Sequence, residues 1–142
     1  MTEKPEARMF TGPKTLDDIH ARLEDCWADN GHVPESIRNQ VAIAVAEIVA
    51  NIVEHAAQAG PVLMHMSIEV RDDEVHVSFT DDGSPCPVDP DEANMPDEFA
   101  DRRRGIPMIR AVLSKLSYHR SPTHNHWRLV SRSFGSGAAR PR

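Results

Sequence analysis

AVAEIVANIVEHA, residues 44–56, has the residue spacing of the middle of a long helix. At about 100° per residue, one apolar stripe of this helix consists of Val41, Ala44, Val45, Ile48 and Ile52. The opposite side is also apolar, with Ile43, Ala46, Ala50 and Val53. Apolar residues on both sides are typical of a helix that is covered on most of its circumference, so we expect neighbours all around it.

Two polar side chains lie beside the first stripe. Glu47 and Asn51 are four residues apart and therefore share one face of the helix, and His55 continues their row one turn on. A carboxylate and a carboxamide at the edge of an apolar surface are partly desolvated, which costs free energy unless they have partners. The row is either the solvated edge of an amphipathic helix or part of a site, and the rest of the chain decides between the two.

Size and composition indicate one globular domain. The 142 residues are enough to bury a core. We expect a cytoplasmic protein without a membrane span, because there is no run of about 18 apolar residues and residues 1–10 lack the apolar stretch of a signal peptide. Cys26 and Cys86 form no CxxC pair, so we expect free thiols.

Charge is distributed unevenly along the chain. The net charge is −6, yet residues 102–142 contain ten Lys and Arg residues and no acid. Such a basic end suits nucleic acid, phosphate or an acidic protein. Nucleic acid is the weakest of these, because aromatic residues are not interleaved with the bases. DNA binding therefore stays as a third, distant hypothesis, which predicts an affinity that falls steeply with salt.

Helical signals occur in three places. Thr15 is the expected N-cap of a first helix, and Gly31 is expected to end it. Pro34 is expected at the first position of the long second helix, which runs to residues 59–60. A third helix is expected over Gly105–Leu116, where apolar residues return to helical spacing.

Alternating apolar residues predict two β-hairpins. The first pairs residues 62–70 with 75–79, the second pairs 116–120 with 126–133, and a short strand is expected at 8–11. Paired strands separated by helices indicate an α+β fold. We expect a two-layer α/β sandwich with a mixed, mostly antiparallel sheet and three helices on one face.

Residues 82–104 contain four prolines, many acids and few apolar residues. A connection of about 20 residues without regular structure is uncommon in a compact domain and is often a functional lid. Composition alone leaves a disordered insertion open as the alternative.

Three motifs occur in a fixed order around these elements. Glu47-x-x-x-Asn51 lies in the long helix, Asp81-Asp82-Gly83 follows the end of a strand, and Gly105 opens a helix after the proline-rich segment. Together with the intervening hairpin and the closing strand pair, this order resembles the Bergerat (histidine-kinase-like, GHKL) ATPases. It is most similar to the small anti-sigma-factor serine kinases of the RsbW type.

The resemblance implies a role for each motif residue. Asn51 would hold Mg²⁺ between the protein and the nucleotide phosphates, and an amide oxygen is a suitable ligand for this metal. Glu47 would be the catalytic base that orients an incoming hydroxyl or accepts its proton. Asp81 would accept a hydrogen bond from the adenine amino group of ATP, and Gly83 would let the backbone turn close to the base.

The start of the third helix belongs to the same implied site. Gly105 would offer the free N–H groups of a helix N-terminus to phosphates, and Arg104 and Ile106 flank it as further cofactor-binding residues. Two positions depart from the family pattern: Arg103 stands where a second glycine is usual, and Pro107 where a small residue is usual.

The resemblance also implies the domain limits. A histidine-kinase-like ATPase domain would span residues 8–133, with an ATP lid at about residues 84–104, and the tails at 1–7 and 134–142 would be flexible.

The implied function is that of an ATP- and Mg²⁺-dependent protein serine kinase and anti-sigma factor of a partner-switching system. It would sequester a sigma factor and phosphorylate a STAS-domain antagonist on serine, without direct contact to nucleic acid. We expect a homodimer, with the first helix (Leu16, Leu23, Trp27) as its contact.

The alternative is a binding module of the same fold that only sequesters a regulatory protein, with nucleotide binding degraded at Arg103 and in the acidic lid. We favour the enzyme because Glu47, Asn51, Asp81 and Gly83 are all present.

Overall fold

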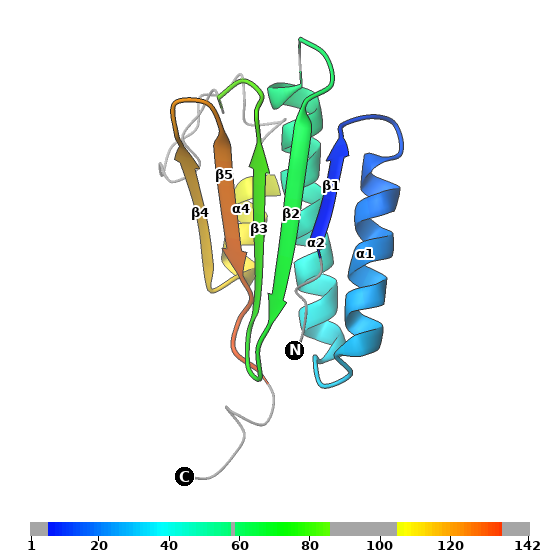
Figure 1. Ribbon diagram of the computed structural model, residues 1–142. Helices are drawn as coiled ribbons and strands as arrows, with labels where there is room; N and C mark the ends of the chain where they lie inside the picture. The colour runs from blue at the N-terminus through cyan, green and yellow to red at the C-terminus, as the bar shows by residue number, and fades with distance from the viewer. Residues whose placement is uncertain (1–5, 58, 86–104, 135–142) are drawn as a thin grey trace.

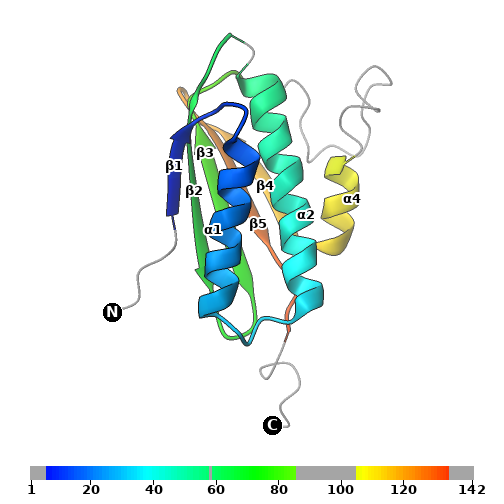
Figure 2. The same cartoon turned by 90° about the vertical axis from the view of Figure 1, so that its right-hand side faces the viewer.

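Two layers make up the fold, which the computed structural model describes for residues 6–57, 59–85 and 105–134. A five-stranded sheet in the order β1-β2-β3-β5-β4 forms one layer (Figure 1), and the helices cover one of its faces (Figure 2). The elements are β1 Glu6–Phe10, α1 Thr15–Asp29, α2 Glu35–Asn51, the π-helical turn η1 Ile52–Ala56, β2 Leu63–Val70, β3 Val75–Asp81, α4 Gly105–Val112, β4 Lys115–Arg120 and β5 Asn125–Val130. The expected α+β sandwich with three α-helices on one face is confirmed.

All neighbouring strands of the described sheet are antiparallel, where we expected a mixed sheet. The chain leaves β1 through two helices that lie side by side and run in opposite directions (Figure 1). It therefore enters β2 antiparallel to β1. The pairs β2–β3 and β4–β5 are hairpins, and strands joined by a short turn are antiparallel.

The two helix starts differ slightly from the prediction. Thr15 is the first residue of α1 and not its N-cap, because the first helical hydrogen bond runs from Asp18 N to Lys14 O at 3.0 Å. The Thr15 hydroxyl instead accepts from Gly12 N at 2.7 Å. Lys14 takes the N-cap position without a side-chain capping bond. Pro34 is the N-cap of α2, with an extended backbone, and not its first helical residue.

The third helix is shorter than expected. It ends at Val112, whereas the apolar spacing predicted helix up to Leu116. Ser114 N donates to Val130 O at 3.0 Å, so the chain joins the sheet directly after the helix. Leu116 is buried as a residue of β4. Its place in the sequence fits the apolar spacing of a strand as well as that of a helix. Pairing with β5 makes it part of a strand.

Ordered structure extends slightly past the expected domain limits. β1 begins at Glu6. At the other end, the Phe134 side chain is buried, and its backbone N donates to Asp73 O at 2.9 Å. The core therefore includes Phe134.

The apolar stripe of α2 is the centre of the core. Val41, Ala44, Val45 and Ile48 are 0% exposed and Ile52 is 1% exposed. By length and composition alone, Glu35–Glu54 could cross a membrane. In the structure its apolar stripe instead packs in the core between the helices and the sheet, as the central helix of a two-layer domain does.

The opposite side of α2 is not covered, so that expectation was wrong. Ile43 is 57% exposed and Val53 is 38% exposed. The reason is the two-layer architecture: α1 and α4 flank α2, and none of the described elements lies over it (Figure 2). Of the residues expected at a dimer contact on α1, Leu23 and Trp27 are buried in the core of the single chain and cannot contribute, whereas Leu16 is 40% exposed. The homodimer itself stays a prediction.

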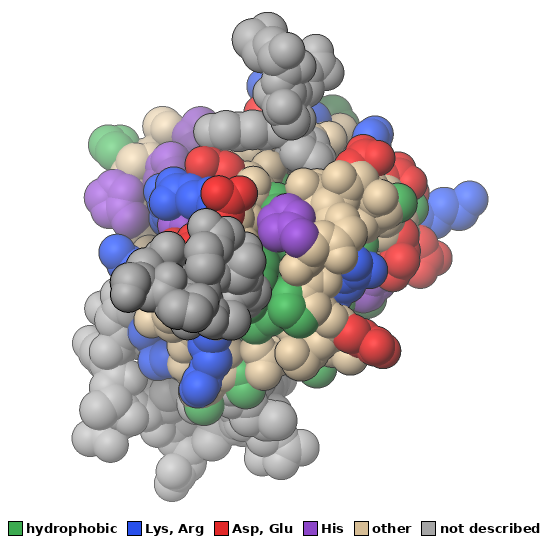
Figure 3. Space-filling model, turned by 90° about the horizontal axis from the view of Figure 1, so that it is seen from below, with side chains coloured by type: hydrophobic (Ala, Val, Ile, Leu, Met, Phe, Trp, Pro, Cys, Tyr) green, Lys and Arg blue, Asp and Glu red, His purple; other side chains and the backbone are tan. Residues whose placement is uncertain are grey.

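The charge asymmetry of the sequence is visible on the folded domain. Residues 105–134, which form α4, β4 and β5, contain no acid. Seen from below (Figure 3), acidic side chains are more frequent on the side of α1 and β1, and Lys, Arg and His are more frequent on the side of β4 and β5.

Ile48→Ala is expected to lower the free energy of unfolding by about 2–5 kcal/mol, because it leaves a cavity in the centre of the core. Ile43→Ala on the same helix is the matched control. It is expected to change that free energy by less than about 0.5 kcal/mol, since most of its side chain is in solvent. Urea unfolding followed by far-UV circular dichroism measures both, and equal losses would contradict the assignment of the two sides of α2.

Candidate functional site

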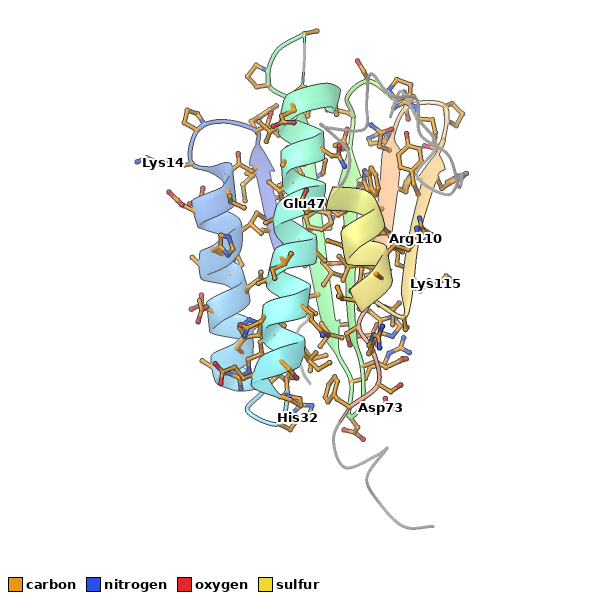
Figure 4. The ribbon with its side chains drawn as sticks, turned by 180° about the vertical axis from the view of Figure 1, so that it is seen from behind. Lys14, His32, Glu47, Asp73, Arg110 and Lys115 are labelled. Atoms are coloured by element: carbon orange, nitrogen blue, oxygen red, sulfur yellow. The ribbon has the colours of Figure 1, made fainter. Side chains whose placement is uncertain are left out.

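The predicted site residues come from three elements. Glu47 and Asn51 lie on α2, Asp81 ends β3 with Gly83 two residues later, and Gly105 begins α4. Figure 4 shows Glu47 on α2 at the height of the N-terminal end of α4, and these two helices are in contact.

Some predicted positions lie outside the part of the chain that the structure describes. They are Arg103 and Arg104, the side chains of Ile106 and Pro107, and the expected lid from residue 86 onward.

Asp81 is a buried carboxylate with one oxygen left over. Its side chain is 1% exposed. Oδ1 accepts hydrogen bonds from Gly83 N and from Asn125 Nδ2, each at 2.9 Å. Among the described residues, no donor contacts Oδ2, which is also buried. A buried acceptor without a partner is destabilising and uncommon, so Oδ2 is a place where the protein can receive a donor from a ligand.

Burial also changes the ionisation of this group. Desolvation raises the pKa of the Asp81 carboxyl above its ordinary value, and the hydrogen bonds from Asn125 and Gly83 counteract the rise. The charge of Asp82 raises this pKa further, and that of Arg120 lowers it. The two hydrogen bonds to Oδ1 thus offset part of the cost of burying this carboxyl group.

Asn125 is the partner of Asp81 that sequence reasoning missed. It lies directly opposite Asp81 in the β3–β5 register and is 2% exposed. Its Nδ2 donates to Asp81 Oδ1 and, at 2.8 Å, to Ser84 O, and its Oδ1 accepts from the Tyr118 hydroxyl. These bonds fix which way the amide points. Asn125 therefore occupies Oδ1 and leaves Oδ2 as the oxygen of this carboxylate without a partner among the described residues.

The signal for Asn125 was weak in the sequence. It stands between two histidines at the edge of a polar turn, and we placed it in the turn. Pairing the second hairpin against β3 would have put this polar residue opposite Asp81 in the interior. That register is a long-range property that local composition does not give.

Gly83 makes a close backbone contact that leaves no room for a side chain. A Cβ built on Gly83 would lie 2.3 Å from Ala56 O and 2.8 Å from Ala56 Cβ. The neighbouring Ser84 N donates to the same Ala56 O at 3.1 Å. On the other side, Arg120 donates to Gly83 O at 2.7 Å. The segment after β3 is thus held between the helical layer and β4.

The helical partner in this contact is a π turn. η1 directly follows Asn51, and Ala57 N donates to Ile52 O at 3.0 Å, five residues back. Single π turns in α-helices are frequently found at functional sites. Here the turn places the Ala56 carbonyl against residues 83 and 84, so α2 is joined to the end of β3 one turn after Asn51.

The Glu47–Asn51 row is partly desolvated, as expected. Asn51 is 8% exposed and Glu47 is half-buried. They are four residues apart on one face of α2, beside the buried stripe. A hollow of about 450 Å³ lies where η1 meets the segment after β3, and it is lined by Ala56, Gly83 and Arg120 among others. Of the motif residues, Gly83 lines this hollow, whereas Glu47, Asn51 and Asp81 do not.

Comparison with known proteins agrees with this arrangement. Residues 12–131 match the family described as histidine kinase-like ATPase domain. The chain is also similar to the serine/threonine-protein kinase BtrW of Bordetella bronchiseptica, with 28% identity over 121 residues, which covers 80% of each chain.

Gly83→Ala is expected to lower the free energy of unfolding by about 1–3 kcal/mol, because the added methyl group meets backbone atoms that cannot rotate away. Gly12→Ala is the control, since a Cβ there has nothing within 4 Å. Thermal and urea unfolding of both variants measure the difference, and a Gly83→Ala variant as stable as Gly12→Ala would show that the close contact is absent.

Asp81→Asn is expected to change how stability depends on pH. Because the pKa of Asp81 is raised above its ordinary value of 3.8, the folded state retains this proton to a higher pH than the unfolded state. The free energy of unfolding of the natural chain therefore falls as the pH rises from that value through the raised pKa.

The Asp81→Asn variant lacks this pH-dependent fall in the free energy of unfolding, because its amide does not titrate. It still offers Oδ1 to Gly83 N and Asn125 Nδ2. Urea unfolding between pH 4 and pH 7 measures the difference between the two proteins. A difference that does not vary with pH would contradict the raised pKa.

Proposed function

The chain belongs to the histidine kinase-like ATPase family, and on this premise we propose that it is an ATP-dependent protein serine kinase. We further propose that it acts as the anti-sigma factor of a cytoplasmic partner-switching system. It sequesters a sigma factor and phosphorylates a STAS-domain antagonist on serine.

The observation that carries the nucleotide part of the proposal is the unpartnered Oδ2 of Asp81. A domain of this family binds ATP, and the exocyclic amino group of adenine is a hydrogen-bond donor that matches a buried carboxylate oxygen. A charge-assisted bond of this kind also removes the cost of leaving Oδ2 without a partner. Asn125 supports the proposal, because it occupies Oδ1 and thereby leaves Oδ2 for the ligand.

The phosphate end of the nucleotide is assigned to the helices. Asn51 would hold Mg²⁺ through its amide oxygen, and the start of α4 at Gly105 would offer backbone N–H groups to phosphate oxygens. The magnesium ion, when bound, neutralises charge on the phosphates. The half-buried Glu47, one helical turn before Asn51, would orient the attacking serine hydroxyl and accept its proton on a carboxylate oxygen.

The kinase part is supported by the similarity to BtrW, which is named a serine/threonine-protein kinase. The sigma factor and the STAS-domain antagonist are supported by the resemblance of the motif set to anti-sigma-factor serine kinases. In such a switch, ATP favours one complex and phosphorylation of the antagonist ends the other. The direction of switching is then a difference of affinities between nucleotide states.

Glu47→Gln and Asn51→Ala are expected to separate catalysis from binding. Glu47→Gln should keep Mg·ATP affinity and lower phosphoryl transfer by about 10²–10⁴-fold, the usual contribution of a general base. Asn51→Ala should weaken Mg·ATP binding itself, because it removes a metal ligand. Calorimetry with Mg·ATP measures binding, and transfer of radioactive γ-phosphate to STAS-domain proteins of the same genome measures catalysis.

Two results would count against the enzyme. If the natural chain gives no heat with Mg·ATP, nucleotide binding is excluded. If it binds Mg·ATP but labels none of the STAS-domain proteins, the alternative holds: a binding module that sequesters a regulatory protein.

A further inference from the structure

The outer side of α2 carries an exposed apolar surface that the proposed nucleotide site does not use. We call it the outer α2 stripe, and it consists of Ala42, Ile43, Ala46, Ala50 and Val53. Ile43 is 57% exposed and Val53 is 38% exposed, and the alanines between them are partly buried. Small residues along the middle of a helix let the axis of a second helix approach to about 8–10 Å.

A groove continues this stripe toward the junction of α1 and α2. It has a volume of about 540 Å³, and its lining includes the acidic residues Glu24 and Glu35. Trp27 and Val33 also line it, but they are only 4% and 2% exposed. Ala42 belongs both to the groove and to the outer α2 stripe. The two features therefore form one continuous surface along α2.

Acidic residues border this surface. Glu24 and Glu35 line the groove, Glu47 borders the outer α2 stripe, and Glu54 directly follows Val53. Arg38, which lines the groove, donates from Nε to Val33 O at 2.9 Å, so its guanidinium is held by the backbone. Figure 3 shows acidic side chains more frequent on the side of α1, while the basic side chains lie more on the side of β4 and β5.

We propose that the outer α2 stripe and the adjoining groove dock a basic amphipathic helix of a partner protein. Apolar residues of that helix would cover Ile43 and Val53, and its Lys or Arg residues would meet the acidic rim, which is the usual way in which a helix binds a hydrophobic groove. The inference rests on the proposed partner-holding function and names the surface and the chemistry of the partner.

The position of the surface connects docking with the nucleotide site. Glu47 is four residues after Ile43 and three residues before Ala50, so it borders the outer α2 stripe on the side of α4 (Figure 4). A helix docked on the stripe therefore lies next to the proposed catalytic carboxylate. A partner helix on this surface would therefore change how easily a substrate reaches Glu47.

The test uses the full chain and a fluorescein-labelled 18-residue amphipathic helix made of leucine and lysine. Fluorescence anisotropy is expected to show saturable binding, and the same helix with glutamate in place of lysine is expected not to bind. Ile43→Ser should weaken binding by about tenfold, as loss of an apolar anchor does. Phe10→Ser is the matched control, because Phe10 is 68% exposed on β1, and it should leave the affinity unchanged.

Three results would overturn the proposal: equal affinity of the natural chain and Ile43→Ser, an equal loss in Phe10→Ser, or equal binding of the glutamate helix. Sedimentation equilibrium without peptide tests a second copy as the occupant, and a dimer that Ile43→Ser dissociates would also overturn it. Mg·ATP binding is measured on the same variants. If docking fails while Mg·ATP still binds, the docking proposal is wrong and the nucleotide proposal stands. If the natural chain binds the peptide but not Mg·ATP, the nucleotide proposal is wrong and the docking surface stands.

Discussion

The rest of the structure depends on how the buried carboxylate of Asp81 is held. Its Oδ1 joins the end of β3 to β5 through Asn125, and it also fixes the turn at Gly83. That turn contacts the backbone of Ala56 in the π turn, where no side chain would fit. At this point, the sheet and the helical layer are joined by backbone and buried polar contacts in addition to the hydrophobic core. A buried charge is tolerated there because two donors satisfy one oxygen, while we propose that the other receives a ligand.

The three sides of α2 have different surroundings. One side packs with the core residues of the sheet and supplies the centre of the core. The next carries Glu47 and Asn51 toward α4. The third is the exposed outer stripe. Because the same rigid element carries all three, the position of the site residues is fixed by core packing, and anything that docks on the outer stripe lies within a helical turn of Glu47. A regulated binding protein needs this closeness if the state of the nucleotide is to change affinity for a partner.

Much of the fold was predictable because its signals are local. The 3.6-residue period identified the buried stripe of α2, and the two-residue period identified both hairpins. Asp81 and Gly83 were found because they follow a strand directly.

What failed depended on contacts between distant segments. Asn125 was assigned to a turn because its partner, Asp81, is 44 residues away. Ile43 was expected to be covered because periodicity cannot tell how many layers a fold has. The end of α4 was misplaced because Leu116 fits both periods, and the role of Gly83 required knowledge of the π turn.

The central claim is that Asp81 Oδ2 receives the amino group of an adenine nucleotide. The most direct test compares the dissociation constants of ADP and inosine diphosphate, which carries a carbonyl oxygen in place of that amino group. Calorimetry with Mg²⁺ is carried out on the natural chain and on Asp81→Asn. The account predicts that the natural chain prefers ADP by roughly 10- to 100-fold, the effect of leaving a buried acceptor unpaired, and that Asp81→Asn loses or reverses this preference. Equal affinities of the natural chain for the two nucleotides, or an unchanged preference in Asp81→Asn, would contradict it.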